Sequence, residues 1–169
     1  MKSLIVYFSK RGENYFQGKI RSLEKGNTER VAEKISEITH AEMFEIETEK
    51  AYPDNYDLCV RVAHEELSNK IKPKLQGYPE HMNEVDVIYL GYPNWWGTMP
   101  MPVVSFLEKF NFQGKTIFPF STSEGSSISK SIEDIKRICP DANVKEGLLI
   151  EGSEVKSSDL KIEAWLRNK

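Results

Sequence analysis

Short apolar runs alternate with helical stretches along this chain, and no other feature limits its fold as strongly. The runs are rich in β-branched and aromatic residues, whereas the stretches between them repeat apolar residues every three to four positions. Strands are expected at residues 3–8, 42–47, 85–91, 115–121 and 144–150, and helices at 28–38, 57–71, 103–110, 128–138 and 157–167. Such alternation predicts right-handed crossovers and an α/β fold with three layers, a doubly wound five-stranded parallel sheet between helices.

The apolar runs also differ in how deeply they are expected to be buried. Residues 4–8 are apolar at every position, which is typical of a strand buried on both faces of a parallel sheet. In residues 42–47, Met43, Phe44 and Ile46 interrupt acidic residues, and this polar content predicts an edge strand. No repeat, low-complexity tract or long linker divides the chain, so residues 1–169 are predicted to form a single domain.

Composition excludes several classes of function. The 23 basic and 26 acidic residues give a net charge of −3, which does not favour sequence-independent binding of nucleic acid. No apolar run approaches the roughly 18 residues of a membrane span, and no signal peptide is recognised, so a soluble cytoplasmic protein is expected. Cys59 and Cys139 fit reduced, buried thiols, and no metal-ligand spacing is found among the cysteine and histidine residues.

The loop after the first strand is expected to lie at the carboxyl edge of the sheet, where such folds bind ligands. Ser9 ends the strand, and Gly26, Asn27 and Thr28 begin the first helix. Hydroxyl, amide and backbone N–H groups at a helix N-terminus suit a phosphate, although Asn27 or Thr28 can equally serve only as an N-cap. Residues 10–25 form an insertion in this loop, which is the kind of place where lids and binding loops occur.

Two further loops follow the third and fourth strands. Residues 92–102 contain Trp95 and Trp96 among prolines and a glycine, which indicates either a stacking platform for a planar ligand or a small hydrophobic cluster under the loop. Residues 122–127 offer hydroxyl and backbone N–H groups that suit the polar edge of a heterocycle. Ser/Gly-rich loops are common, so this third loop is a weak signal alone.

Together the three loops resemble those of the flavodoxin family. The resemblance rests on residues 6–9 with 26–28, on 91–97, and on 122–126, and the matching order of elements extends over essentially the whole chain. It implies the strand order 2-1-3-4-5, a short-chain form and FMN as cofactor. It implies FMN contacts at Ser9, Asn27, Thr28, Pro93, Asn94, Trp95, Trp96, Gly97, Thr122, Ser123, Glu124, Gly125 and Ser126. Trp96 is the first expectation for packing against the flavin ring, and Trp95 the second.

The chain departs from the flavodoxin pattern in two places. Its phosphate loop is interrupted by residues 10–25, so the motif does not assign Lys10 or Arg11 to the phosphate. The third loop also lacks the tyrosine that shields one flavin face in many flavodoxins. That face is therefore expected to be open to a substrate, or covered by Tyr15 or Phe16 of the insertion.

The resemblance implies a redox protein in which FMN carries the chemistry and no side chain is catalytic. The first expectation is an electron carrier between protein partners, and the alternative is an FMN-dependent NAD(P)H reductase acting on quinones or similar small acceptors. We also expect Glu124 either to lie near the flavin and lower its reduction potential, or to be a solvated loop acid. No nucleic-acid or membrane partner is expected, and the sequence leaves the oligomeric state open.

Overall fold

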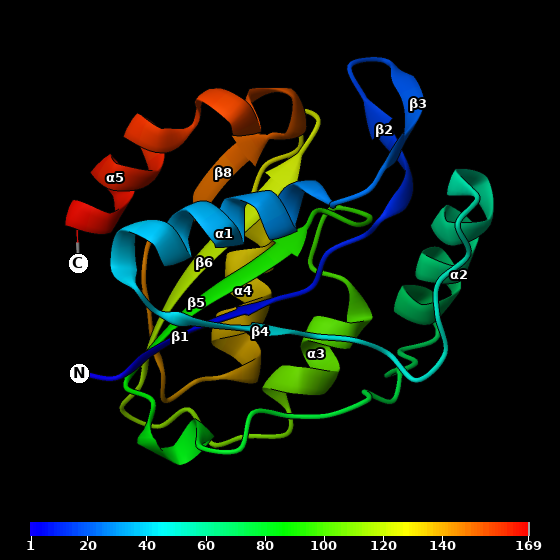
Figure 1. Ribbon diagram of the computed structural model, residues 1–169. Coiled ribbons are helices and arrows are strands. Elements are labelled where there is room, and N and C mark those ends of the chain that lie inside the picture. Colours follow the sequence, from blue (N-terminus) through cyan, green and yellow to red (C-terminus); the bar gives the residue numbers. More distant parts are fainter. Residues whose placement is uncertain (169) are drawn as a thin grey trace.

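A parallel sheet forms the middle layer of the molecule. The computed structural model describes residues 1–168 and places the strands in the order β4-β1-β5-β6-β7, with β8 also pairing with β6 (Figure 1). Every pair in this sheet is parallel, and the order confirms the arrangement 2-1-3-4-5. The strands are β1 (Ser3–Tyr7), β4 (Glu42–Glu45), β5 (Val87–Pro93), β6 (Thr116–Ser123), β7 (Asn143–Val144) and β8 (Leu148–Glu151).

The fifth position of the sheet differs from the expectation of one strand at residues 144–150. It is shared by the two-residue β7 and the four-residue β8, with residues 145–147 between them. This break contains Gly147. A glycine weakens the interior of a strand because it has no side chain to pack and loses more conformational entropy on folding than other residues. Both pieces still pair with β6, so the order of the sheet is unaffected.

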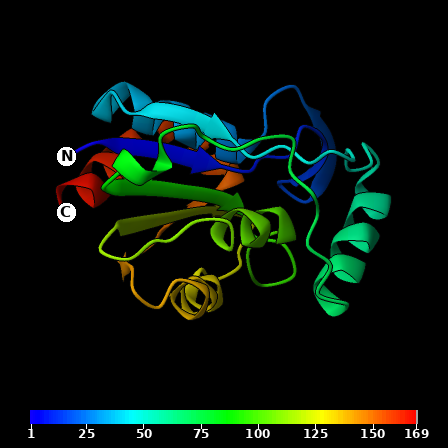
Figure 2. The same cartoon turned by 90° about the horizontal axis from the view of Figure 1, so that it is seen from below.

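Helices cover the two faces of the sheet and enclose two hydrophobic cores. Helices α1 (Asn27–Thr39) and α5 (Asp159–Arg167) lie on one face, and α3 (Met101–Leu107) and α4 (Ser129–Ile138) on the other (Figures 1 and 2). Strand β1 contributes Ile5 and Tyr7 to the first core and Leu4 and Val6 to the second, which confirms that it is buried on both sides. Within residues 1–168, no helix is long and apolar enough to cross a membrane.

Helix α2 (Tyr56–Ser68) lies apart from these layers. The alternation of elements predicted a helix on one face of the sheet here, but α2 lies beyond the carboxyl ends of the strands (Figures 1 and 2). Its principal contacts are with α3 and with strand β2 (Gly12–Phe16). The helix begins after Asn55, whose side chain caps it by accepting a hydrogen bond from the Leu58 N–H at 3.0 Å.

The insertion at residues 10–25 forms an ordered β-hairpin. Strand β2 pairs antiparallel with β3 (Lys19–Leu23), and the turn between them is formed by Gln17 and Gly18. The hairpin extends from the carboxyl end of β1 and lies beside α2 (Figure 1). The hairpin and α2 therefore lie side by side beyond the carboxyl edge of the sheet, which is the edge where doubly wound folds bind their ligands.

Candidate functional site

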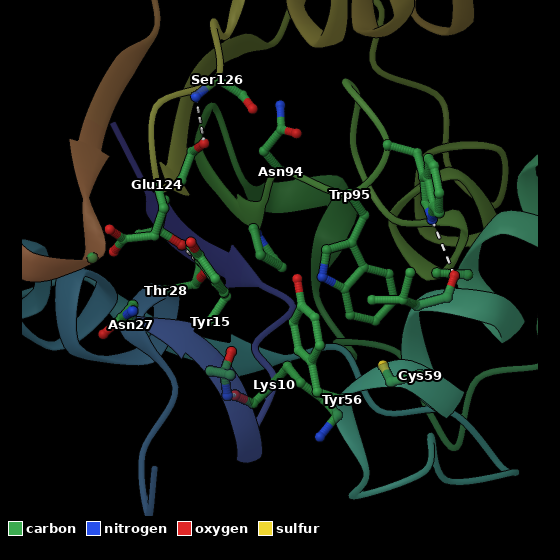
Figure 3. A pocket seen from close by; sticks show the side chains of 18 of the residues that line it. Lys10, Tyr15, Asn27, Thr28, Tyr56, Cys59, Asn94, Trp95, Glu124 and Ser126 are labelled. Atoms are coloured by element: carbon green, nitrogen blue, oxygen red, sulfur yellow. Dashed lines mark hydrogen bonds between the residues drawn. The ribbon is translucent and has the colours of Figure 1, made fainter. Parts of the chain in front are cut away.

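A cavity of about 420 Å³ lies at the carboxyl edge of the sheet (Figure 3). The loops after β1, β5 and β6 form one part of its wall, and the hairpin and α2 form the rest. This is the point where the chain crosses from one side of β1 to the other, from β4 to β5. The volume falls within the range of roughly 300–1,000 Å³ that is typical of small-molecule sites.

The first loop is held tightly against the start of α1. The N-cap is Gly26, and neither Asn27 nor Thr28 caps the helix with its side chain, which corrects that sequence-based alternative. The Glu29 N–H donates instead to Ser9 Oγ at 3.1 Å, which leaves the hydroxyl proton of Ser9 free for another acceptor. A Cβ on residue 26 would overlap Ser9 Oγ and lie 2.8 Å from the Lys10 carbonyl oxygen, so this approach requires glycine.

Thr28 connects the first loop to the third. Its buried Oγ1 lies 2.8 Å from Thr122 Oγ1, in a hydrogen bond that joins the start of α1 to the end of β6. Next to it, Oδ1 of Asn27 is buried and has no hydrogen-bond partner among residues 1–168. Burying a polar atom without a hydrogen-bond partner destabilises the fold unless a ligand or a water molecule forms that hydrogen bond.

Gly152 begins the short 3-10 helix η2 (Gly152–Ser157) that follows β8, and its lack of a side chain makes room for Asn27 and Glu124. A Cβ there would overlap Asn27 Nδ2 and would lie 2.5 Å from Glu124 Oε1. Glu124 also accepts a hydrogen bond from the Ser153 N–H at 3.2 Å. Its carboxylate therefore borders the cavity beside Asn27, while the residue as a whole is exposed.

The second loop places its two tryptophans differently. Trp95 is partly buried and packs edge-on against Phe8 and Tyr52, with ring centroids 5.2 and 5.1 Å apart. Trp96 is half exposed, its Nε1 donates to the Val60 carbonyl at 3.1 Å, and its φ of 53° is unusual for a bulky residue. Trp95 is thus the rigid platform of the cavity, and Trp96 forms part of its mouth.

The hairpin is fastened to the N-terminus of α2. Glu13 accepts a hydrogen bond from the Tyr56 N–H at 2.7 Å, and its own N–H donates to the Asp54 carbonyl at 3.3 Å. The rings of Tyr15 and Tyr56 lie 6.3 Å apart and are tilted by 35°. Of the two aromatic residues expected to cover a ligand from the insertion, Tyr15 lines the cavity (Figure 3), and Phe16 is stacked by Arg21 at 5.3 Å instead.

One face of α2 forms the remaining wall. Tyr56, Cys59, Val60 and Ala63 recur at the spacing of a single helix face, and all four line the cavity; we call them the α2 stripe. Burial raises the pKa of the Cys59 thiol to about 11, although nearby Lys10 acts in the opposite direction. The thiol is therefore neutral near pH 7, and the stripe carries no ionised group.

Lys10 and Arg11 have different surroundings. Lys10 lines both the cavity and a smaller neighbouring hollow, its Nζ donates a hydrogen bond to the Arg11 carbonyl oxygen, and it is the cationic residue of the cavity wall within the described part of the chain. Arg11 lies at a separate hollow of about 200 Å³, where its Nη2 is 3.3 Å from Glu29 Oε1 and 3.0 Å from Glu45 Oε2. The two acids thus hold Arg11 away from the cavity.

Most of the site residues expected from the sequence meet at this cavity. Two do not line it: Ser9 of the first loop lines the smaller hollow instead, and Gly125 lies outside the lining. The residues that line it as expected are Asn27, Thr28, Pro93, Asn94, Trp95, Trp96, Gly97, Thr122, Ser123, Glu124 and Ser126. Sequence reasoning missed Lys10, Glu13, Asn14, Gly152 and the α2 stripe. The sequence predicts a helix over residues 57–71, but an apolar helix face does not by itself indicate whether it packs against the sheet or lines a cavity.

A doubly wound parallel sheet with a helix N-terminus, an aromatic platform and a polar loop around one cavity defines a flavodoxin-like α/β protein. The model of the flavodoxin family matches residues 20–169. The chain therefore belongs to the flavodoxin family. The match begins within β3, so β1 and most of the hairpin lie outside it.

Solved structures agree with this assignment. A proposed flavoprotein from Bacteroides eggerthii DSM 20697 is 30% identical, with a TM-score of 0.80 over 99% of this chain and 96% of that one. Another from Bacteroides uniformis ATCC 8492 is 29% identical, with a TM-score of 0.77 and coverages of 98% and 97%. A flavoprotein from Lactobacillus acidophilus NCFM, solved in complex with FMN, is 25% identical, with a TM-score of 0.67 and coverages of 92% and 97%. No curated protein matches the sequence.

Proposed function

We propose that this chain binds FMN in the cavity and transfers electrons through it. The observation that carries the proposal is that three loops far apart in sequence supply an anion-accepting helix N-terminus, an aromatic platform and a polar edge to one cavity. The Lactobacillus acidophilus flavoprotein, a structural relative, is solved with FMN, which supports this choice of flavin. When bound, FMN supplies one- and two-electron chemistry, and the protein supplies binding and orientation.

The residues of the first loop fit a phosphate group. Gly26 lets the loop pack closely against the start of α1, where Asn27 and Thr28 line the cavity. The positive end of the α1 dipole favours an anion here. The buried amide oxygen of Asn27 has no hydrogen-bond partner in residues 1–168. The Asn27 amide therefore forms part of a polar cradle in which a bound ligand would supply the missing hydrogen bond.

The other two loops fit the flavin ring. Trp95 offers an indole that Phe8 and Tyr52 hold in place, so little conformational entropy is lost when a ring packs against it. The turn of the third loop is fixed by a hydrogen bond from the Ser126 N–H to Ser123 Oγ at 2.9 Å. Together with Glu124, this loop faces the polar edge of the proposed ring position.

The first role that we propose is electron carriage between protein partners. Tyr15 and Trp96, at the mouth of the cavity, are 46% and 50% exposed, so a partner surface can reach the site. The second candidate is an FMN-dependent NAD(P)H reductase for quinones or similar small acceptors. The α2 stripe favours this second role because it gives the cavity an uncharged wall that a protein-to-protein carrier does not need.

A titration of the purified protein with FMN tests the central proposal. We expect a shift of the visible flavin spectrum and quenching of flavin fluorescence by Trp95. Anaerobic addition of NADH or NADPH then separates the two roles. Rapid bleaching identifies a reductase, whereas a bound flavin that is reduced only by dithionite or by a reductase protein identifies a carrier. A free-flavin spectrum at saturating protein would overturn the assignment of FMN.

A further inference from the structure

The hairpin carries positive charge on a chain that is negative elsewhere. Residues 10–25 contain five basic and two acidic residues, so this segment has a net charge of +3, whereas the rest of the chain has a net charge of −6. The hairpin projects beyond the carboxyl edge of the sheet, beside the cavity (Figure 1). A separation of charge of this kind orients a charged partner during its approach, and here it directs an acidic partner to the end of the molecule where the cavity opens.

Two of the basic residues are available to such a partner. Arg11 and Lys25 form ion pairs with acidic residues of the chain itself. Lys19 and Arg21 are exposed on β3, and neither has an ion-pair partner in the described part of the chain. The Arg21 guanidinium lies 5.3 Å from the centre of the Phe16 ring, and this cation–π contact holds the charge on the surface of the hairpin.

Apolar side chains of the hairpin are exposed as well. Tyr15 and Ile20 are paired directly across the two strands and are 46% and 49% exposed. Side chains at directly opposite positions lie on the same face of a hairpin, and Tyr15 lines the cavity. An apolar surface therefore continues from the mouth of the cavity onto β3. Lys19 and Arg21 occupy the alternate positions of β3, so their cationic groups flank this surface.

The outer edge of β3 is open. In the described part of the chain β3 pairs with β2 on one side and with no strand on the other, so its outer N–H and C=O groups are accessible to another protein. A second copy of this chain is a poor occupant, because pairing of two β3 strands would bring Lys19 and Arg21 of both copies together, and like charges across strands destabilise a pair. An acidic surface fits this edge without such repulsion.

We propose that Tyr15, Lys19, Ile20 and Arg21 form the docking surface for an acidic one-electron redox protein. The inference rests on the proposed FMN site and names the class of partner for the carrier role. The two cations attract carboxylates of the partner, and the two apolar side chains exclude water from the contact, which places the partner's redox centre beside the mouth of the cavity. Each partner molecule gains one electron at its metal. Two partner molecules therefore oxidise one fully reduced flavin, whose protons pass to the solvent.

Electron transfer to plant plastocyanin, an acidic copper protein, tests the inference. The FMN-loaded protein is reduced photochemically without oxygen and mixed with oxidised plastocyanin in a stopped-flow instrument. The loss of the blue copper absorbance then measures the second-order rate constant. Raising the concentration of NaCl from about 10 to about 300 mM should lower this constant tenfold or more, because salt screens the attraction that steers the two proteins together.

Charge reversal on β3 should remove this attraction. We expect Lys19→Glu/Arg21→Glu to lower the rate constant about tenfold at low salt and less than about twofold at high salt. Ile20→Ser should lower it about threefold at both concentrations, because an apolar contact is not screened. The matched control is Lys136→Glu/Lys161→Glu, which makes the same change of net charge at exposed residues outside the cavity lining. This control should change the rate constant less than about twofold.

Two other acceptors separate docking from a change in the flavin itself. The reaction with O2, which is uncharged and needs no docking, should proceed at the same rate in every variant. Mitochondrial cytochrome c is basic and should be reduced faster by Lys19→Glu/Arg21→Glu than by the wild type. If this variant folds poorly, Lys19→Gln/Arg21→Gln should shift both rates in the same directions by smaller factors.

Three results would overturn the inference. One is a plastocyanin rate that does not depend on salt, and another is an equal loss of rate in Lys19→Glu/Arg21→Glu and in Lys136→Glu/Lys161→Glu, which would show that net charge alone matters. The third is sedimentation of the wild type as a dimer that Arg21→Glu dissociates, because a second copy would then occupy this edge.

Failure of the proposed function would give a different pattern. If the wild type binds no FMN, the proposed function fails, but cross-linking with a carbodiimide needs no flavin. An amide bond between Lys19 Nζ and a plastocyanin carboxylate, identified by mass spectrometry at low salt and lost at high salt, would leave the docking surface in place. Absence of that cross-link from a protein that does bind FMN would overturn the docking surface alone.

Discussion

At Gly152, adding a single methyl group should affect ligand binding more than it affects the stability of the fold. A Cβ there meets only the ends of the flexible Asn27 and Glu124 side chains, which can move aside. We therefore expect Gly152→Ala to change the free energy of unfolding by no more than about 1 kcal/mol. The affinity for FMN should fall roughly tenfold, because the displaced groups are part of the proposed cradle.

The matched control for this substitution is Gly77→Ala, since a Cβ at Gly77 meets no atom within 4 Å. Denaturant unfolding and a fluorescence titration with FMN measure the two quantities for both variants. If Gly152→Ala and Gly77→Ala bind FMN equally well, Asn27 and Glu124 do not belong to the cofactor site.

Cys59 and Cys139 provide a second comparison at this scale, because burial raises the pKa of both thiols to about 11. Only the thiolate is alkylated, so for both cysteines the rate should rise about tenfold per pH unit between pH 7.5 and 9.5. Cys59 lines the cavity and Cys139 belongs to a hydrophobic core. FMN should therefore slow the alkylation of Cys59 alone, as measured by mass spectrometry of the peptides. Equal protection of both thiols would indicate global stabilisation instead.

Glu124 is expected to influence the flavin through its charge. A carboxylate beside the ring opposes the negative charge that reduction brings, so Glu124→Gln should raise the reduction potential, by an amount on the order of tens of millivolts. Spectroelectrochemical titration measures this change, and Glu154→Gln, which alters an acid outside the cavity lining, is the control. A potential unchanged in Glu124→Gln would leave Glu124 as a solvated loop acid.

At the scale of elements, the hairpin and α2 behave as one unit because Glu13 joins them. Glu13→Ala removes the acceptor of the Tyr56 N–H, and a hydrogen bond of this kind contributes about 1 kcal/mol. The dissociation rate of FMN should therefore rise about fivefold, measured by the recovery of flavin fluorescence after dilution. Deletion of residues 12–22 should have a larger effect in the same direction.

The control for this experiment is Glu24→Ala, which changes an exposed acid after β3 that does not line the cavity. Glu24→Ala should leave the dissociation rate at its wild-type value. If neither Glu13→Ala nor the deletion changes that rate, the hairpin does not close the cavity and is available to face a partner.

The elements of the sheet and its covering helices could be predicted because their apolar patterns match their periods. The unbroken apolar run at residues 4–8 indicates burial on both faces, and the polar residues of the three loops can be read from the sequence itself. The hairpin was not predicted, because the Gln17-Gly18 turn lacks the Asn-Gly or Asp-Gly signal and β3 is almost entirely exposed. The place of α2 was not predicted either, because periodicity shows that a helix has an apolar face but not what that face packs against.

Within the site, residues that directly follow a strand or begin the next helix could be predicted from the sequence. Residues that other elements bring to the site could not. Asn27, Trp95 and Glu124 belong to the first group. Gly152 belongs to the second, since its importance comes from the close approach between η2, which follows β8, and the start of α1, and no local sequence pattern indicates that approach.

For the whole molecule, ligand binding should be visible as thermal stabilisation. A ligand present at one hundred times its Kd adds about 2.7 kcal/mol to the free energy of unfolding. For a chain of this length, that corresponds to a rise in Tm of roughly 5–10 °C. Differential scanning fluorimetry with FMN measures the rise, and riboflavin, which lacks the phosphate, should give a clearly smaller one at the same concentration. Equal shifts would show that the start of α1 does not bind the phosphate.

The interrupted fifth position of the sheet affects whether neighbouring molecules can pair through their sheet edges. An open sheet edge exposes unpaired N–H and C=O groups and can recruit a strand from a neighbouring molecule. Here one edge is divided between β7 and β8, which are two and four residues long, and the other is the four-residue β4, which carries Glu42 and Glu45. Short or acidic edges are poor templates for strand addition. We therefore expect neither edge of the sheet to recruit a strand from a neighbouring molecule readily.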